Sequence, residues 1–230
     1  MEENRFFKLV WRFNGLILMI AGVLAIGLLI FVGYTLIKEK TSNRNVTNII
    51  NIQEETDIKE KWKLGHISNI QGSSYIMVPL TSDQNYAQSY YSKSSSSIRN
   101  YLFINSKDNT QNWLFDNNKY LINSINLLPN SQYNEKKKNV KAIMYQIVKQ
   151  DSNKDSRLTS DDLQTVALSL PDGTGYKEII HNVDNFVGQS LVDENTMLII
   201  YQIDGIGFSV IVDLSSFKVT NETVLKAVNS

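Results

Sequence analysis

The most prominent pattern in the chain is an unbroken apolar run near its amino end. Residues 15–37 read GLILMIAGVLAIGLLIFVGYTLI and contain no acidic or basic side chain. At about 1.5 Å rise per residue, a helix of this length would extend roughly 34 Å, enough to cross a hydrocarbon core of about 30 Å. Trp11 and Tyr34 stand near its two ends, where amphipathic rings favour the membrane interface. The pattern therefore predicts a transmembrane helix over residues 15–37.

A cleaved signal peptide is the competing interpretation of this run. Such a peptide has an apolar region of about 7–15 residues that ends at a small-x-small cleavage site. Here the run is longer, and the sequence YTLIK at residues 34–38 offers no such site, so an uncleaved anchor is predicted. Basic residues are nearly balanced across the run, but the short tail of residues 1–14 favours a cytoplasmic amino terminus. We therefore expect a single-pass protein of a bacterial inner membrane, with its carboxyl-terminal domain in the periplasm.

The rest of the chain alternates between short apolar runs and polar turns. Residues 38–60 are polar and are expected to form a juxtamembrane spacer, and residues 61–230 are expected to form one mainly β ectodomain. Because no internal repeat is clean, a propeller-like assembly and a sandwich both remain open. The polar stretch 88–97 is expected to be a solvated loop, and Asp204-Gly205 is the strongest hairpin signal. Strands are expected at residues 75–80, 100–105, 112–115, 119–126, 196–203, 206–214 and 217–220.

Composition narrows the possible functions. The 23 basic and 23 acidic side chains balance, whereas nucleic-acid-binding surfaces normally show a basic excess, so no nucleic-acid partner is expected. The chain has no cysteine, which excludes disulfides, thiolate metal sites and cysteine nucleophiles. His66 and His181 are its only histidines, and no G-x-S-x-G elbow or phosphate-binding loop is present. The sequence therefore predicts a protein without enzymatic activity.

One segment carries the pattern of a metal-binding loop. Residues 151–162 read DSNKDSRLTSDD, which matches most of the twelve-residue calcium loop of EF-hands. Alternating oxygen-bearing residues let one turn of backbone wrap a hard cation, and Leu158 occupies the apolar position that anchors such loops to a core. The predicted ligands are Asp151, Asn153, Asp155, the backbone carbonyl of Arg157, Thr159 and Asp162.

Two positions of this loop depart from the EF-hand pattern. Ser156 stands where glycine normally supplies a positive φ, at an expected cost of about 1 kcal/mol. Asp162 stands where a longer glutamate normally closes the loop with both carboxylate oxygens. The departures predict a weak, structural Ca²⁺ site. The alternative interpretation is an Asx-rich turn that caps a following helix.

The segments that flank the loop define its setting. Residues 140–149 fit either periodicity, and a strand is favoured; residues 163–170 follow helical spacing up to the turn at 171–173. The expected arrangement is therefore a strand-loop-helix insertion in the β ectodomain.

Several segments together carry a resemblance to a family. They are RNYLFINSKDNTQNWLF, YQIVKQDSNKDSRLTSDD, LPDGTGY and the closing YQIDG with IVDL. Over residues 62–215 the chain resembles an uncharacterised family of proteobacterial membrane-anchored proteins with one amino-terminal membrane helix, a β-rich ectodomain and an EF-hand-like acidic loop. The resemblance implies cation ligands at Asp151, Asn153, Asp155 and Asp162, and it implies no particular activity.

The anchor, the spacer and the acidic loop together favour a non-catalytic accessory or interaction protein. Such a protein would lie in a lipid bilayer and would dock on another membrane protein or form a homo-oligomer. The alternative is an extracytoplasmic sensor or ligand-binding module that relays the occupancy of its site through the membrane helix.

Overall fold

The computed structural model describes residues 5–41, 49–52, 60–88, 91–129 and 139–226. Contacts within the chain separate two compact units, Met1–Val46 and Thr47–Ser230. Residues 42–48 and 53–59 of the predicted spacer lie outside the described residues.

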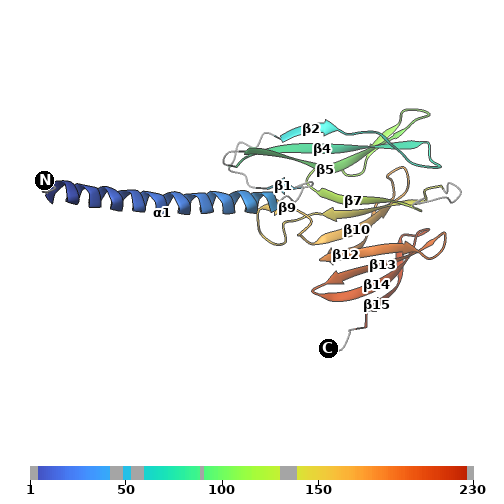
Figure 1. Ribbon diagram of the computed structural model, residues 1–230. Helices are drawn as coiled ribbons and strands as arrows, with labels where there is room; N and C mark the ends of the chain where they lie inside the picture. The colour runs from blue at the N-terminus through green and yellow to red at the C-terminus, as the bar shows by residue number, and fades with distance from the viewer. Residues whose placement is uncertain (1–4, 42–48, 53–59, 89–90, 130–138, 227–230) are drawn as a thin grey trace. The chain divides into compact units, whose positions relative to one another are not determined.

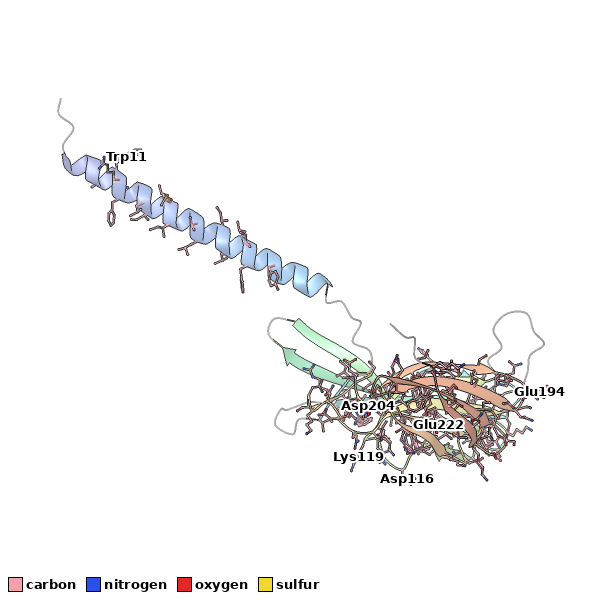
Figure 2. All side chains as sticks on the ribbon, turned by 90° about the horizontal axis from the view of Figure 1, so that it is seen from below. Trp11, Asp116, Lys119, Glu194, Asp204 and Glu222 are labelled. Atoms are coloured by element: carbon pink, nitrogen blue, oxygen red, sulfur yellow. The ribbon has the colours of Figure 1, made fainter. Side chains whose placement is uncertain are left out.

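The first unit contains one long helix. α1 spans Arg5–Thr41, so it begins inside the predicted tail and continues past the predicted end at residue 37. Its segment Val10–Tyr34 is long and apolar enough to cross a membrane, and none of that segment is buried within the protein. Figure 2 shows side chains projecting from the central part of the helix, with Trp11 near one end. The expected apolar amino-terminal helix is confirmed.

The second unit is built almost entirely from antiparallel strands, which confirms the expected β-rich domain. Three sheets of sequential strands follow one another along the chain, and a two-strand sheet pairs β1 with β9. The first sheet has the order β2-β4-β5-β6 with β3 paired to β4, the middle sheet the order β11-β10-β8-β7, and the last sheet the order β12-β13-β14-β15. The strand bounds are β1 Ile50–Asn51, β2 Glu60–Leu64, β3 Ser68–Asn69, β4 Tyr75–Gln88, β5 Tyr91–Asn105, β6 Gln111–Trp113, β7 Leu121–Leu128, β8 Ala142–Val148, β9 Arg157–Leu158, β10 Gln164–Ser169, β11 Lys177–Val183, β12 Asn185–Leu191, β13 Thr196–Ile203, β14 Ile206–Asp213 and β15 Lys218–Val224.

The central strands of the middle sheet, β8 and β10, are buried on both faces. In β8, Ala142 and Met144 join the core shared with the last sheet, whereas Ile143, Tyr145 and Ile147 join the core shared with the first sheet. Successive strand residues point to opposite faces, so every second side chain of β8 faces one core and the others face the second core. Figure 1 shows the same order of layers, from β4 and β5 through β7 and β10 to β12–β15. The middle sheet therefore holds the domain together.

The helix predicted for residues 163–170 is wrong. The segment forms β10, whose six residues are all buried and which pairs with both β8 and β11. Val166 and Leu168 face one core, and Ala167 faces the other. A strand buried on both faces reads as a continuous apolar run and loses the alternation that identifies strands. The strand favoured for residues 140–149 is confirmed as β8.

The long hairpin of the first sheet also differs from expectation. Residues 88–97 were expected to form a loop, but Gln88 ends β4 and Tyr91 begins β5, and the two residues pair with each other. The serine-rich residues after Tyr91 continue the pairing of β4 with β5. Backbone hydrogen bonds hold two strands together without any apolar side chain.

The remaining predicted strands all correspond to strands of the structure, but β15 continues to Val224, four residues past its predicted end. The hairpin of β13 and β14 turns at Asp204-Gly205, and both turn residues have positive φ, 51° and 75°. This is the backbone that an Asp-Gly pair adopts most readily in a two-residue hairpin.

Candidate functional site

The acidic loop has the positive φ that the sequence predicts at Ser156, and a second one at Lys154 that it does not predict. Ser156 has φ 64° and Lys154 has φ 61°, both in the left-handed region. The Asp151 carboxylate accepts the backbone N–H groups of Asp155 and Ser156, at 3.1 and 2.8 Å. Asn153 Oδ1 accepts the Asp155 N–H at 2.9 Å. The tight turn is therefore stabilised by its own side chains.

The residues that follow the turn attach the loop to the domain. Arg157 and Leu158 form β9, where Arg157 pairs with Asn51 and Leu158 pairs with Ile50 of β1. Leu158 is buried in a small core with Ile50, Leu121 and Val148. The expected apolar anchor is therefore confirmed.

Asp162 acts as a buried hydrogen-bond acceptor for the loop. Only 1% of the residue is exposed. Its Oδ1 accepts the backbone N–H and the hydroxyl of Ser152, at 2.8 and 3.1 Å, and the N–H of Asn153 at 3.3 Å. Its Oδ2 accepts the Thr159 N–H at 2.9 Å. The carboxylate thus joins the start of the loop to its end through four donors.

The cation ligands predicted for this loop stay a prediction. Among the described residues, no group of three or more acidic, histidine or cysteine side chains lies close enough to hold a metal ion. A carboxylate oxygen has two lone pairs, and three donors already point at Oδ1 of Asp162. In this conformation Asp162 cannot close a metal site with both oxygens, and no helix follows it.

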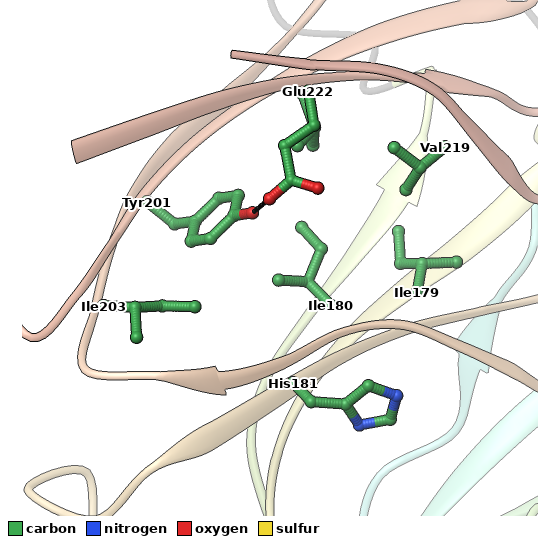
Figure 3. Close-up of a pocket in the computed structure, with 8 residues that line it drawn as sticks. Ile179, Ile180, His181, Tyr201, Ile203, Val219 and Glu222 are labelled. Atoms are coloured by element: carbon green, nitrogen blue, oxygen red, sulfur yellow. Dashed lines mark hydrogen bonds between the residues drawn. The ribbon is translucent and has the colours of Figure 1, made fainter. Parts of the chain in front are cut away.

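A second candidate site is a pocket between the edge strand β11 and the last sheet. Its volume is about 170 Å³, smaller than the roughly 300–1,000 Å³ of most small-molecule sites. Figure 3 shows its aliphatic wall, together with Tyr201, Glu222 and His181. The lining residues are Ile179, Ile180, His181, Tyr201, Ile203, Val210, Val219 and Glu222.

A tyrosine and a glutamate from different strands meet in this pocket. The Tyr201 hydroxyl donates to Glu222 Oε1 at 2.7 Å. The Tyr201 residue is only 2% exposed, and its ring stacks on Phe208 at 5.4 Å between centroids. Burial, and then the adjacent Glu222 carboxylate, raise the pKa of the Tyr201 phenol. Tyr201 therefore remains a neutral donor to Glu222 at neutral pH.

A separate charged network lies behind His181. Glu178 accepts a hydrogen bond from Lys149 Nζ at 2.8 Å, and the His181 Nδ1 atom lies 3.5 Å from its other oxygen. Burial raises the pKa of Glu178, but the hydrogen bond and charge of Lys149, with smaller contributions from Tyr176 and His181, outweigh it and hold the pKa below its ordinary value. The charge of Glu178 is thus balanced by partners of its own, whereas Glu222 has no cationic partner among the described residues.

Arg99 is a buried charge with a structural role. Its Nε donates to the Asn118 carbonyl at 2.8 Å, its guanidinium lies 5.6 Å from the Trp62 ring centroid, and its Nη2 is 3.7 Å from Glu60. The neighbouring Asn100 amide donates to the Phe115 carbonyl at 2.8 Å. These contacts connect β2, β5 and the loop after β6, so they explain the position of both polar side chains.

The two polar residues of the pocket could hardly be found from the sequence. Tyr201 lies inside a predicted strand, and Glu222 lies beyond the predicted end of the last strand at residue 220. They meet because β14 pairs with both β13 and β15, and a register shift between Ile211 and Val212 changes how the exposed strand β15 aligns with β14. A bulge of this kind has no dependable sequence signal.

Comparisons with known proteins add a distant structural likeness. The chain matches no family model and no curated protein sequence. A similar solved structure is the β-propeller domain of the Trilobed protease from Pyrococcus furiosus, with a TM-score of 0.36 and 14% sequence identity. The match covers 71% of this chain and 44% of that chain, so the chain spans less than half of this neighbour. At this distance the likeness assigns neither a family nor an activity.

Proposed function

We propose that this chain is a single-pass, membrane-anchored accessory or interaction protein whose β-rich domain acts by binding. The supporting observation is the apolar segment Val10–Tyr34, none of which is buried within the protein. Apolar surface exposed to water is costly at about 25 cal/mol per Å², and a bilayer provides the missing apolar environment. The proposed location is a bacterial inner membrane with the β domain in the periplasm.

The β domain has its own cores and does not need the helix to complete them. All three core clusters are made of residues between Ile50 and Phe217. An anchored domain of this kind is free to contact a neighbouring protein, and we propose a membrane protein or a second copy of the chain as its partner. Membership of the proteobacterial family that the sequence resembles is part of the same proposal.

The anchor can be tested by substituting leucines inside the apolar segment and, as a control, one leucine outside it. Leu24 and Leu28 lie in the apolar segment, and Leu64 lies on β2; all three are more than half exposed. An arginine at the centre of a membrane helix costs about 2.5–3.5 kcal/mol. We expect the chain with Leu24→Arg and Leu28→Arg to leave the membrane fraction on alkaline extraction, whereas Leu64→Arg stays. Extraction of the unmodified chain by alkali alone would refute membrane anchoring.

The accessory role has a separate test. The full chain, crosslinked in native membranes and purified in mild detergent, should carry a stoichiometric partner or a second copy. A chain that runs as an uncrosslinked monomer under these conditions would contradict that role.

We infer that the domain is propeller-like and is not a two-sheet sandwich. The support is that successive antiparallel sheets, each built from strands adjacent in sequence, pack face to face through two cores. This is the relation between neighbouring blades of a propeller, whereas a sandwich has one core between two sheets. A crystal structure with only one continuous core would refute this inference.

A structural calcium ion at residues 151–162 also stays a proposal. The left-handed turn at Lys154 and Ser156 and the oxygens of Asp151, Asn153 and Asp155 support it. The four donors on Asp162 count against a complete site. Melting temperatures measured with calcium and with a chelator distinguish a calcium site from a loop held by hydrogen bonds alone.

The second candidate function is a ligand-binding module that relays occupancy through its membrane helix. The pocket lined by Tyr201 and Glu222 favours it, because this pocket combines an aliphatic wall with a carboxylate that has no cationic partner among the described residues. A saturable ligand that changes crosslinking between the helices of two copies would support such a relay, and binding without that change would contradict it.

A further inference from the structure

We propose that the pocket between β11 and the last sheet binds a primary alkylammonium group, with Glu222 as its counter-ion and Tyr201 as a second acceptor. This inference deepens the second candidate function by naming the chemistry of the ligand. It rests on the groups that line the pocket and on the hydrogen bond drawn in Figure 3.

The first step is the charge of the site. Glu222 is the only acidic residue of the lining. One of its oxygens accepts the Tyr201 hydroxyl, and no described residue donates to the other oxygen. Figure 3 shows His181 lying away from the Tyr201–Glu222 pair, and its Nδ1 faces Glu178. Glu222 lies on the exposed strand β15, so the pocket presents an unbalanced negative charge at its solvent-facing rim, which favours a cation over an anion.

The second step is the direction of the hydrogen bonds. The only proton of the Tyr201 hydroxyl is committed to Glu222, so its oxygen is left as an acceptor. The free oxygen of Glu222 is also an acceptor. A ligand must therefore bring at least two N–H or O–H donors, and an ammonium group carries three donors together with the required charge. A quaternary ammonium carries none.

The third step is the size and the wall of the pocket. Ile180 and Val210 are buried, and the remaining aliphatic residues of the lining are more exposed. A volume of about 170 Å³ accepts a short alkyl chain and excludes the larger nucleotides and sugars that occupy sites of about 300–1,000 Å³. Such an alkyl chain could belong to a free amine or to the lysine side chain of a protein.

The test is a titration of the full-length, isotope-labelled chain in detergent micelles, followed by amide chemical shifts. The probe is n-butylammonium chloride, and n-butanol and sodium butyrate are the neutral and anionic controls. We expect saturable shifts at Ile180, Tyr201 and Glu222 with the amine only. Equal shifts with butanol or butyrate, or no saturable shift with the amine, would overturn the proposal.

Two variants and a matched control assign the binding to these groups. Glu222→Gln keeps an acceptor for Tyr201 but removes the charge, and it should weaken butylammonium binding about tenfold, the difference between charged and neutral hydrogen bonds. Tyr201→Phe should also weaken it. Glu194→Gln changes a carboxylate that Figure 2 shows far from Glu222 and should leave binding unchanged. Unaltered binding in Glu222→Gln, with the remaining spectrum intact, would refute the counter-ion role.

A second probe distinguishes the two sources of the amine. If Nα-acetyl-lysine methylamide binds at least as tightly as butylammonium, the site takes a lysine side chain from a protein. If only butylammonium binds, it takes a free amine. The crosslinking test of the accessory role involves neither amine nor Glu222, so failure of one test leaves the other intact.

Discussion

Asp162→Asn is expected to destabilise the β domain because the carboxylate at residue 162 is buried and accepts four hydrogen bonds. Asparagine keeps nearly the same volume but has one oxygen and one NH₂ group. If the amide oxygen keeps the three donors of Ser152 and Asn153, the NH₂ group must face the Thr159 N–H. Two donors then oppose each other inside the protein, where an unsatisfied polar group is costly.

The size of the effect follows from these bonds. Hydrogen bonds to a charged group contribute about 1.5–3 kcal/mol each and neutral ones about 0.5–1.5 kcal/mol, so losing the charge weakens each retained bond by roughly 1 kcal/mol. The three retained bonds together lose about 3 kcal/mol and the lost bond a further 1.5–3 kcal/mol, so we expect a decrease of about 4.5–6 kcal/mol in the free energy of unfolding. For a domain of this size the melting temperature should fall by about 9–24 °C.

The assay is thermal unfolding of the full chain in micelles, followed through the β-sheet circular dichroism. It is carried out with a chelator and again in about 5 mM Ca²⁺, above the 0.1–1 mM dissociation constants of weak extracellular sites. Asp155→Ala is the comparison, because Asp155 is exposed and its Oδ1 accepts a single hydrogen bond, from the Arg157 N–H. Without metal, its removal should therefore cost much less than the change at the buried Asp162.

The two substitutions separate a hydrogen-bonded loop from a calcium site. If Asp162 acts as described, Asp162→Asn lowers the melting temperature equally in chelator and in calcium. If calcium binds, the effect of Asp155→Ala grows when calcium is added. A melting temperature for Asp162→Asn within 2 °C of the unmodified chain in chelator would refute the reasoning about its four donors.

Two further predictions concern packing and pH. Gly173→Ala should lower the melting temperature far more than Gly205→Ala, although both glycines have positive φ. A Cβ added at Gly173 would lie 2.3 Å from the Phe103 ring, whereas no atom lies within 4 Å of a Cβ added at Gly205. Gly205→Ala, the control, should lower the free energy of unfolding only by the left-handed backbone strain of about 1 kcal/mol. Similar melting temperatures for the two variants would contradict this account. Burial raises the pKa of Glu178, but Lys149 outweighs it and holds the pKa below its ordinary 4.5. The Glu178–Lys149 pair therefore stabilises the fold above pH 4.5. This stabilisation is lost as the pH falls through the lower pKa of Glu178 in the folded protein. Glu178→Gln should lower the free energy of unfolding by less than about 1 kcal/mol, because the pair is partly exposed. This difference from the unmodified chain should become smaller in acid. A difference that grows below pH 4.5 would reverse the assigned direction.

The local sequence predicted two kinds of element correctly. One is a strand with one apolar and one polar face, and the other is a turn whose residues favour one backbone conformation. The β13–β14 hairpin was placed correctly because Asp204-Gly205 favours positive φ and the flanking runs contain many β-branched residues. The same reasoning failed at residues 163–170. Val166, Ala167 and Leu168 are all buried, and a uniformly apolar run fits a helix as well as a strand.

The acidic loop and the pocket mark where local information ends. The sequence alone determined that Ser156 takes a left-handed backbone, because the spacing of its Asx neighbours favours a tight turn, and that one helix is long and apolar enough to cross a membrane. Only the tertiary structure decided that Asp162 points at the backbone of Ser152, and that Tyr201 meets Glu222 across two strands. Turn conformation and apolar length depend on neighbouring residues, whereas these contacts depend on strand register and on which sheets pack together, which only the folded chain determines.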